Sequence, residues 1–187
     1  SMKTSRLIVA GLHGSEAEHW QSWWQLQDPQ AQRVPQDDWH HPDLNIWTSR
    51  LQQSIATSSS GKVWLVAHSF GCLISVKAAL MNPEKIAGLF LVAPADPQRF
   101  AIAVSELADT LPVPSLVIAS TTDPYLSLEK AKAWATIWGS QLINLGDVGH
   151  INVASGFGAW PQGIELFEYL CSQFSEQELV DFWRLSA

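Results

Sequence analysis

Short apolar segments rich in Val, Ile and Leu recur along the chain and are separated by polar, glycine-containing turns. Each run is continuous instead of alternating with polar residues, which is typical of a strand covered on both faces of a sheet. The pattern predicts strands at residues 6–10, 62–67, 87–93, 115–120 and 141–145, and a less apolar run predicts a sixth at 31–34.

Stretches with helical spacing lie between these strands. In residues 43–56, Leu44, Trp47, Leu51 and Ile55 fall near one helical face, and residues 70–81 are apolar nearly all round, which predicts a buried helix. The same spacing predicts helices at 16–26, at 128–138 and from Pro161 onward. Ser175 with Glu178 matches a capping box, which predicts a separate last helix ending near Arg184.

Alternating strands and helices predict an α/β fold, in which a six-stranded parallel sheet lies between two helix layers. No repeat or linker divides the chain, so we expect one domain over residues 2–187, with Ser1 left over from cloning. In such a sheet, ligands bind at the carboxyl ends of the strands. Candidate chemistry is therefore sought there.

Charge and cysteine content narrow the classes of partner and compartment. Eighteen acidic against eleven basic residues give a net charge of -7 without any basic run, so neither nucleic acid nor an anionic membrane is an expected partner. Two cysteines suit a reducing compartment, and the apolar run at 7–10 is too short for a signal peptide or a membrane span. We expect a cytoplasmic protein.

The predicted strand at 62–67 runs into the buried helix through Ala67-His68-Ser69-Phe70-Gly71. Small residues two before and two after a serine are what a sharp strand-to-helix turn requires, so this segment predicts a nucleophile elbow with Ser69 as the nucleophile. The Phe70 N–H, at the helix N-terminus, is then a candidate oxyanion donor. His68 is expected to be a packed histidine and not the base.

A serine nucleophile needs a base that is oriented by an acid, in the chain order Ser, Asp, His. Asp123 follows the predicted strand at 115–120, and His150 follows the one at 141–145, so both should reach the same sheet edge as Ser69. Asp96, after the strand at 87–93, and Asp147, three residues before the histidine, are rival acids.

Three further expectations concern the second oxyanion donor, cofactors and the residues that contact the substrate. Leu12, in the glycine-containing loop at 11–15, is the candidate for the second oxyanion donor through its N–H. No cofactor or metal is expected, since the loop matches no phosphate-binding motif, the histidines lack metal-ligand spacing, and Cys72 reads as a packed thiol. Apolar candidates for substrate contact are Phe100, Phe157 and Trp160, with Phe70 beside the nucleophile.

Beyond the triad order, sequence blocks spread over nearly the whole chain resemble the small serine hydrolases related to retinoblastoma-binding protein nine, a subgroup of the α/β-hydrolases. The blocks are His19-Trp20-Gln21-Ser22-Trp23-Trp24, Gln36-Asp37-Asp38-Trp39-His40-His41-Pro42, Ala67-His68-Ser69-Phe70-Gly71 and Gly149-His150-Ile151-Asn152. The resemblance implies the same triad and a reduced sheet of six parallel strands. The Leu-x-Cys-x-Glu segment for binding the retinoblastoma protein is absent, so that partner is not expected.

These observations favour a serine hydrolase that cleaves small carboxylic esters through an acyl-serine. The interval at 93–115 is too short for a cap domain, which favours short acyl chains. The alternative is a protein-binding module that keeps the fold and makes little use of the triad. Trp23, Trp24 and Trp39 would contribute to its binding surface if they were exposed.

Overall fold

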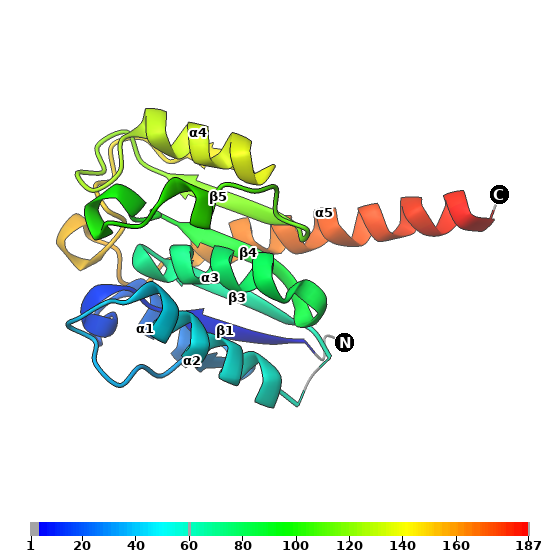
Figure 1. Ribbon diagram of the computed structural model, residues 1–187, viewed down its shortest axis with the longest axis horizontal. Coiled ribbons are helices and arrows are strands. Elements are labelled where there is room, and N and C mark those ends of the chain that lie inside the picture. The colour runs from blue at the N-terminus through cyan, green and yellow to red at the C-terminus, as the bar shows by residue number, and fades with distance from the viewer. Residues whose placement is uncertain (1–3, 60, 187) are drawn as a thin grey trace.

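Six parallel strands form the sheet that the apolar segments predict (Figure 1). The computed structural model describes residues 4–59 and 61–186, with the backbone alone for residues 174–186. The strand order is β2-β1-β3-β4-β5-β6. The strands are β1 (Ser5–Val9), β2 (Ala31–Arg33), β3 (Val63–His68), β4 (Ile86–Val92), β5 (Ser115–Ala119) and β6 (Gln141–Asn144).

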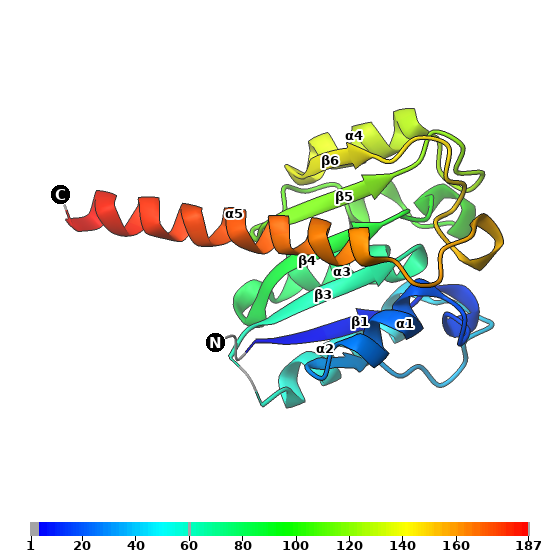
Figure 2. The same cartoon turned by 180° about the vertical axis from the view of Figure 1, so that it is seen from behind.

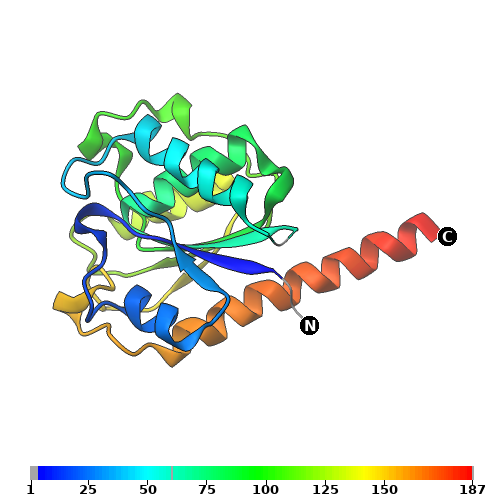
Figure 3. The same cartoon turned by 90° about the horizontal axis from the view of Figure 1, so that it is seen from below.

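Helices cover both faces of the sheet (Figures 1 and 2). The helices α2 (Leu44–Thr57), α3 (Phe70–Met81) and α4 (Leu128–Trp138) pack on one face, against side chains such as Leu65 and Ala67. The helices α1 (Trp20–Gln27) and α5 (Pro161–Ser186) pack on the other face, against Trp64 and Val66. Seen from below, the sheet lies between these two layers (Figure 3). Because successive strand residues point to opposite faces, every central strand contributes to both cores.

The strand order reverses between β1 and β3. From β1 the chain moves outward to β2 at one edge, and from β3 it proceeds through β4 and β5 to β6 at the other. The loops after β1 and β3 therefore diverge, which opens a crevice at the carboxyl ends of these strands, as in other open α/β sheets. The Ser69 turn and the loop at 11–15 border this crevice.

Two helix boundaries differ from those that the spacing predicts. The helix predicted from residue 16 begins at Trp20, because Ser15 has a φ of 55° and the His19 side chain caps the helix by accepting the Gln21 N–H. The last helix does not restart at Ser175, since α5 is continuous from Pro161 to Ser186. No proline or glycine follows Gly163 to interrupt it, and a Ser-x-x-Glu segment can continue a helix as well as begin one. The side chains of Ser175 and Glu178 lie outside the described residues.

The segment between β4 and β5 contains only two short 3-10 turns, Pro97–Phe100 and Val104–Glu106. No cap domain stands over the carboxyl end of the sheet in this segment, as its length predicts. Two of the three tryptophans considered for a binding surface are half-buried, and Trp24 is buried in the core between α1, β4 and α5.

Candidate active site

Ser69 stands at the turn between β3 and α3 in a conformation that few residues adopt. Its φ of 56° and ψ of -121° are those of a strained turn, and holding a residue in such a conformation costs on the order of 1 to 3 kcal/mol of folding free energy. Backbone bonds hold it there: the Ser69 N–H donates to Val92 O at 3.1 Å, and Ser69 O accepts from the N–H groups of Cys72 and Ala95. The sharp turn places the Ser69 side chain at the carboxyl edge of the sheet.

The structure brings Ser69, His150 and Asp123 together. His150 Nε2 lies 3.0 Å from Ser69 Oγ, and His150 Nδ1 lies 3.0 and 3.1 Å from the two carboxylate oxygens of Asp123. A carboxylate can only accept, so Nδ1 carries the proton of the neutral ring and Nε2 is left to accept the serine O–H. The three residues follow β3, β5 and β6, which places them at one edge of the sheet.

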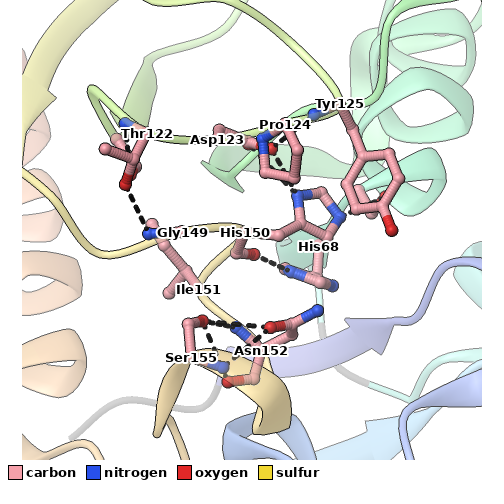
Figure 4. Close-up of polar contacts among 12 residues, drawn as sticks. His68, Thr122, Asp123, Pro124, Tyr125, Gly149, His150, Ile151, Asn152 and Ser155 are labelled. Atoms are coloured by element: carbon pink, nitrogen blue, oxygen red, sulfur yellow. Dashed lines mark hydrogen bonds and ion pairs between the residues drawn. The ribbon is translucent and has the colours of Figure 1, made fainter.

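Asp123 and His150 are both buried, and the surrounding loops orient them (Figure 4). One Asp123 oxygen also accepts the Tyr125 N–H at 2.9 Å, and the Tyr125 ring stands edge-on to the His150 ring with centroids 4.6 Å apart. Thr122 Oγ1 accepts the Gly149 N–H at 3.0 Å, which ties the loop of the acid to the loop of the histidine.

The rival acids are bound elsewhere. Asp96 Oδ2 pairs with Lys130 Nζ at 2.8 Å, and its other oxygen accepts the Gln98 N–H at the start of a 3-10 turn. Asp147 is exposed. Within the described residues, Asp123 alone has a carboxylate in contact with the His150 ring.

His19 and His68 form a buried row with His150, with successive ring centroids 4.7 and 4.8 Å apart. Burial lowers the pKa of His19 to about 3, assisted by the positive charge of Arg33 and by His150. Burial also lowers the pKa of His68 well below its usual value, assisted by its two histidine neighbours. Both rings are therefore neutral at physiological pH, and His68 is the packed, hydrogen-bonded residue that its place in the elbow suggests.

A cavity of about 460 Å³ opens directly over Ser69, and we refer to it as the Ser69 cavity. Its wall is mixed, because apolar Leu12, Phe100 and Tyr125 alternate with charged Glu16, Asp96 and Arg99. The lining residues are Gly11, Leu12, His13, Ser15, Glu16, His19, His68, Ser69, Ala95, Asp96, Arg99, Phe100, Tyr125, His150 and Asn152.

Of the aromatic residues considered for substrate contact, Phe100 lines the Ser69 cavity. Phe70 packs inward against Trp47 and Phe100, with centroid distances of 5.4 and 4.8 Å. Phe157 and Trp160 pack against each other, and Trp160 stands edge-on to Trp20 in the core. The structure thus places these two residues outside the cavity wall.

The loop after β1 lies against the elbow. A Cβ added to Gly11 would be 3.1 Å from both Phe70 N and Ser69 Cβ, a tight contact that glycine avoids and that a larger residue would relieve only by a small shift of the elbow or the loop. The His13 N–H donates to Trp39 O and the Gly14 N–H to Gly11 O, whereas the hydrogen bonds of the described residues leave Leu12 N–H and Phe70 N–H without an acceptor. Two backbone donors therefore remain available beside the serine.

A larger cavity of about 820 Å³ lies at the opposite end of the sheet, among Arg6, Trp24, Trp64 and Phe167. Its lining includes the nucleophile types Cys171, Thr4, Ser172 and Lys62, but no histidine that could act as a base, and burial raises the pKa of the Cys171 thiol to about 12. Hydrolytic chemistry is therefore supported at the Ser69 cavity and not at this larger one.

Two kinds of feature are absent from the described residues. None of their helices is both long enough and apolar enough to cross a membrane. No three of their His, Cys, Asp or Glu side chains are grouped in a way that would hold a metal ion.

Sequence reasoning missed several residues around His150. Tyr125, Thr122 and Trp20 each contact its ring or its loop, and the Trp20 Nε1–H donates to Ile151 O at 2.9 Å. The Ser-Thr-Thr segment directly before Asp123 is a signal for a hydrogen-bonded turn, since hydroxyl side chains often accept from nearby backbone N–H groups. Nothing in the local pattern links Trp20 to a loop so distant in sequence.

A family model for serine hydrolases matches residues 6–169, which span most of the 187-residue chain. The chain belongs to the serine hydrolase family. Ser69, Asp123 and His150 all fall within the matched segment of this serine hydrolase. A search of curated proteins found no significant match.

Solved structures agree with this family. A protein described as a YdeN-like hydrolase from Pectobacterium atrosepticum has 37% identity and a TM-score of 0.87, over 91% of this chain and 92% of that one. The ydeN gene product of B. subtilis has 21% identity and a TM-score of 0.74, over 91% of this chain and 100% of that one. Est1E of Butyrivibrio proteoclasticus, solved with ferulic acid bound, has 15% identity and a TM-score of 0.69, over 94% and 90%.

These similarities confirm two predictions made from the sequence. The serine hydrolase has the α/β-hydrolase fold that its alternating strands and helices and its elbow predict, and it is a hydrolase. The closer relationship to the retinoblastoma-binding protein nine group stays a prediction, because the matched family is the broader one.

Proposed function

We propose that this serine hydrolase cleaves small carboxylic esters through an acyl-serine intermediate on Ser69. The observation that carries the proposal is the continuous hydrogen-bonded row from Ser69 Oγ through His150 to Asp123, with contacts of 3.0 Å on both sides of the imidazole. Such a row makes a weak hydroxyl nucleophile reactive, because the base accepts its proton as the oxygen attacks.

In the first half of the reaction, Ser69 Oγ bonds to the ester carbonyl carbon and its proton passes to His150 Nε2. The negative charge that develops on the carbonyl oxygen is stabilised by Leu12 N–H and Phe70 N–H, the two backbone donors left without acceptors beside the serine. The bond to the leaving alkoxide then breaks, and the alkoxide takes the proton from His150 Nε2. The products of this half are an alcohol and acyl-Ser69.

The second half regenerates the enzyme. Water attacks the acyl carbon and gives a proton to His150 Nε2, and collapse of this intermediate returns the proton to Ser69 Oγ and releases the carboxylic acid. Asp123 holds the Nδ1–H tautomer of His150 in both halves and stabilises the imidazolium that forms each time. No cofactor enters either half.

The dimensions of the Ser69 cavity support a small substrate. Its volume of about 460 Å³ is at the lower end for ligand sites, and no cap extends it. Phe100 and Tyr125 provide apolar contact for an acyl or alcohol group, whereas Arg99 and Glu16 make the rim polar.

Labelling with a fluorophosphonate probe tests the proposal. We expect stoichiometric modification of the wild-type protein, located on the Ser69 peptide by mass spectrometry, and none of Ser69→Ala. Ser75→Ala is the matched control, since Ser75 lies on α3, which Ser69 precedes, and its hydroxyl donates to Gly71 O and does not line the Ser69 cavity. The proposal fails if the folded wild-type protein is not labelled, or if Ser69→Ala is labelled equally.

A further inference from the structure

We propose that Trp20 and His68 are positioning residues that hold the backbone of the catalytic histidine, so that His150 Nε2 stays within reach of Ser69 Oγ. The inference rests on the proposed function, because it takes His150 as the base. Its basis is the pair of hydrogen bonds that these two buried side chains donate to successive carbonyls, those of His150 and Ile151.

His68 contacts the histidine loop directly. Its Nε2 lies 2.9 Å from His150 O (Figure 4), and because a carbonyl only accepts, His68 must carry its proton on Nε2. The neutral state of this buried ring leaves a single N–H to donate, and the contact with His150 O uses it. Since His68 also precedes Ser69 in the chain, one short segment fixes both the nucleophile and the base.

Trp20 supports the next residue from a different element. Its Nε1–H donates to Ile151 O at 2.9 Å, and its ring stands perpendicular to the His68 ring with centroids 5.9 Å apart. Trp20 is fully buried and does not line the Ser69 cavity, so its influence on the reaction has to pass through the histidine loop.

The backbone of this loop needs support, because its conformation is an unusual one. Ile151 has a φ of 51°, which a β-branched residue rarely adopts, and Gly149 has a φ of 59°. Thr122 and Ser120 accept the N–H groups of Gly149 and Val148 from the other side of the loop. The segment that carries His150 is thus held by donors from β3 and α1 and by acceptors from the loop after β5.

The paired contacts make the position of the base sensitive to Trp20, which does not line the Ser69 cavity, and to His68, which does. If the 150–151 carbonyls lose their donors, the loop can relax from its unusual conformation, and the imidazole moves with it. A displacement of about 1 Å between reacting groups can lower a rate about 100-fold. Loss of the donors should therefore reduce turnover far more than it reduces substrate binding.

Trp20→Phe tests this with a matched control in the same chain. Trp138 is equally buried, and its Nε1–H donates to Leu107 O at 2.9 Å, remote from the site, so Trp138→Phe removes the same kind of bond. The assay uses p-nitrophenyl acetate, and kcat is calculated from the concentration of folded enzyme. We expect Trp20→Phe to lower kcat about 10- to 100-fold and to keep KM within about twofold of the wild-type value. Trp138→Phe should leave kcat unchanged.

A second pair of variants covers the possibility that Trp20→Phe fails to fold. The amide nitrogen of glutamine can occupy nearly the same place as His68 Nε2, so His68→Gln should retain most of the turnover. His68→Leu, which has similar bulk but no donor, should lose it. Equal kcat values for Trp20→Phe and Trp138→Phe, or for His68→Gln and His68→Leu, would overturn the proposal.

Proton NMR provides a readout that does not depend on ester cleavage. The His150 Nδ1–H that faces Asp123 should give a low-field resonance, assigned by its loss in Asp123→Asn. We expect Trp20→Phe to shift or broaden this resonance and Trp138→Phe to leave it in place. If the wild-type protein cleaves no ester, the proposed function fails while this measurement still decides whether Trp20 positions His150, because an unchanged resonance in Trp20→Phe would contradict it.

Discussion

Gly71 packs directly against the backbone of Val9, so closely that a Cβ added to Gly71 would lie 2.1 Å from Val9 O. This contact joins the first turn of α3 to β1, on the other side of the crevice. It explains why the position two residues after Ser69 is glycine, since any side chain would push the elbow away from the loop that holds Leu12.

We expect Gly71→Ala to lower the free energy of unfolding by about 3 kcal/mol or more, because a rigid backbone carbonyl cannot move away as a flexible side chain could. Urea titration monitored by tryptophan fluorescence measures this. Gly61→Ala is the control, since an added Cβ there meets nothing within 4 Å, and its effect should be within about 0.5 kcal/mol. Equal stability of the two variants would contradict the close packing of Gly71 against Val9 O.

Asp123→Asn should keep the fold and lower kcat on the order of 10³- to 10⁴-fold, because an amide stabilises the wrong tautomer of His150. Asp96→Asn is the matched change at the rival position. Its carboxylate is paired with Lys130 instead of His150, so we expect a much smaller loss. Steady-state kinetics with p-nitrophenyl acetate compares the two, and a larger loss in Asp96→Asn would reassign the acid.

Stability should decline in mild acid because of the buried histidines. His19 has a pKa of about 3 in the folded protein against 6.5 for the free side chain, and the pKa of His68 is also lowered. The unfolded chain therefore binds more protons below pH 6.5, so stability is full above that pH and falls as the pH drops towards 3. His19 alone should cost roughly 2 to 3 kcal/mol between pH 6.5 and 4.5.

Urea unfolding at those two pH values measures this loss, and the variants below separate it from the carboxyl groups, which begin to titrate near the lower pH. His19→Gln should reduce the difference between the two pH values, because no buried imidazole remains there to be protonated on unfolding. His41→Gln removes an exposed imidazole and should leave the difference as it is in the wild type. A His19→Gln protein with an unchanged pH dependence would argue against the buried, neutral state of His19.

A series of p-nitrophenyl esters should show the highest kcat/KM for short acyl chains such as acetate or butyrate, well above palmitate. Each buried CH₂ contributes roughly 0.8 kcal/mol only while apolar wall remains, and charged Glu16, Asp96 and Arg99 interrupt the wall of the Ser69 cavity. Because no cap covers the site, the rate should not rise abruptly where the substrate forms micelles. A maximum at sixteen carbons would contradict the small cavity.

The sequence identifies the elements and the elbow because these depend on local rules. Continuous apolar runs signal strands covered on both faces, and Ala67, Ser69 and Gly71 satisfy the steric demand of one tight turn. The same rules predict that Ser69, Asp123 and His150 meet, because each follows a parallel strand and the carboxyl ends of these strands lie at one edge of the sheet.

Several features depend instead on which distant segments meet. Phe157 and Trp160 look like Phe100 in the sequence, yet Trp160 packs against Trp20, Phe157 packs against Trp160, and Phe100 lines the Ser69 cavity. Lys130 on α4 forms an ion pair with Asp96 in the loop after β4, and this contact distinguishes Asp96 from Asp123 in a way that no local pattern can. Trp20 reaches the carbonyl of Ile151, 131 positions away, only because α1 and the loop after β6 lie side by side once the sheet has formed. The hydrophobic pattern around a residue indicates how deeply that residue is buried. Its contact partners depend on how the helices and strands pack together, which the local pattern does not encode.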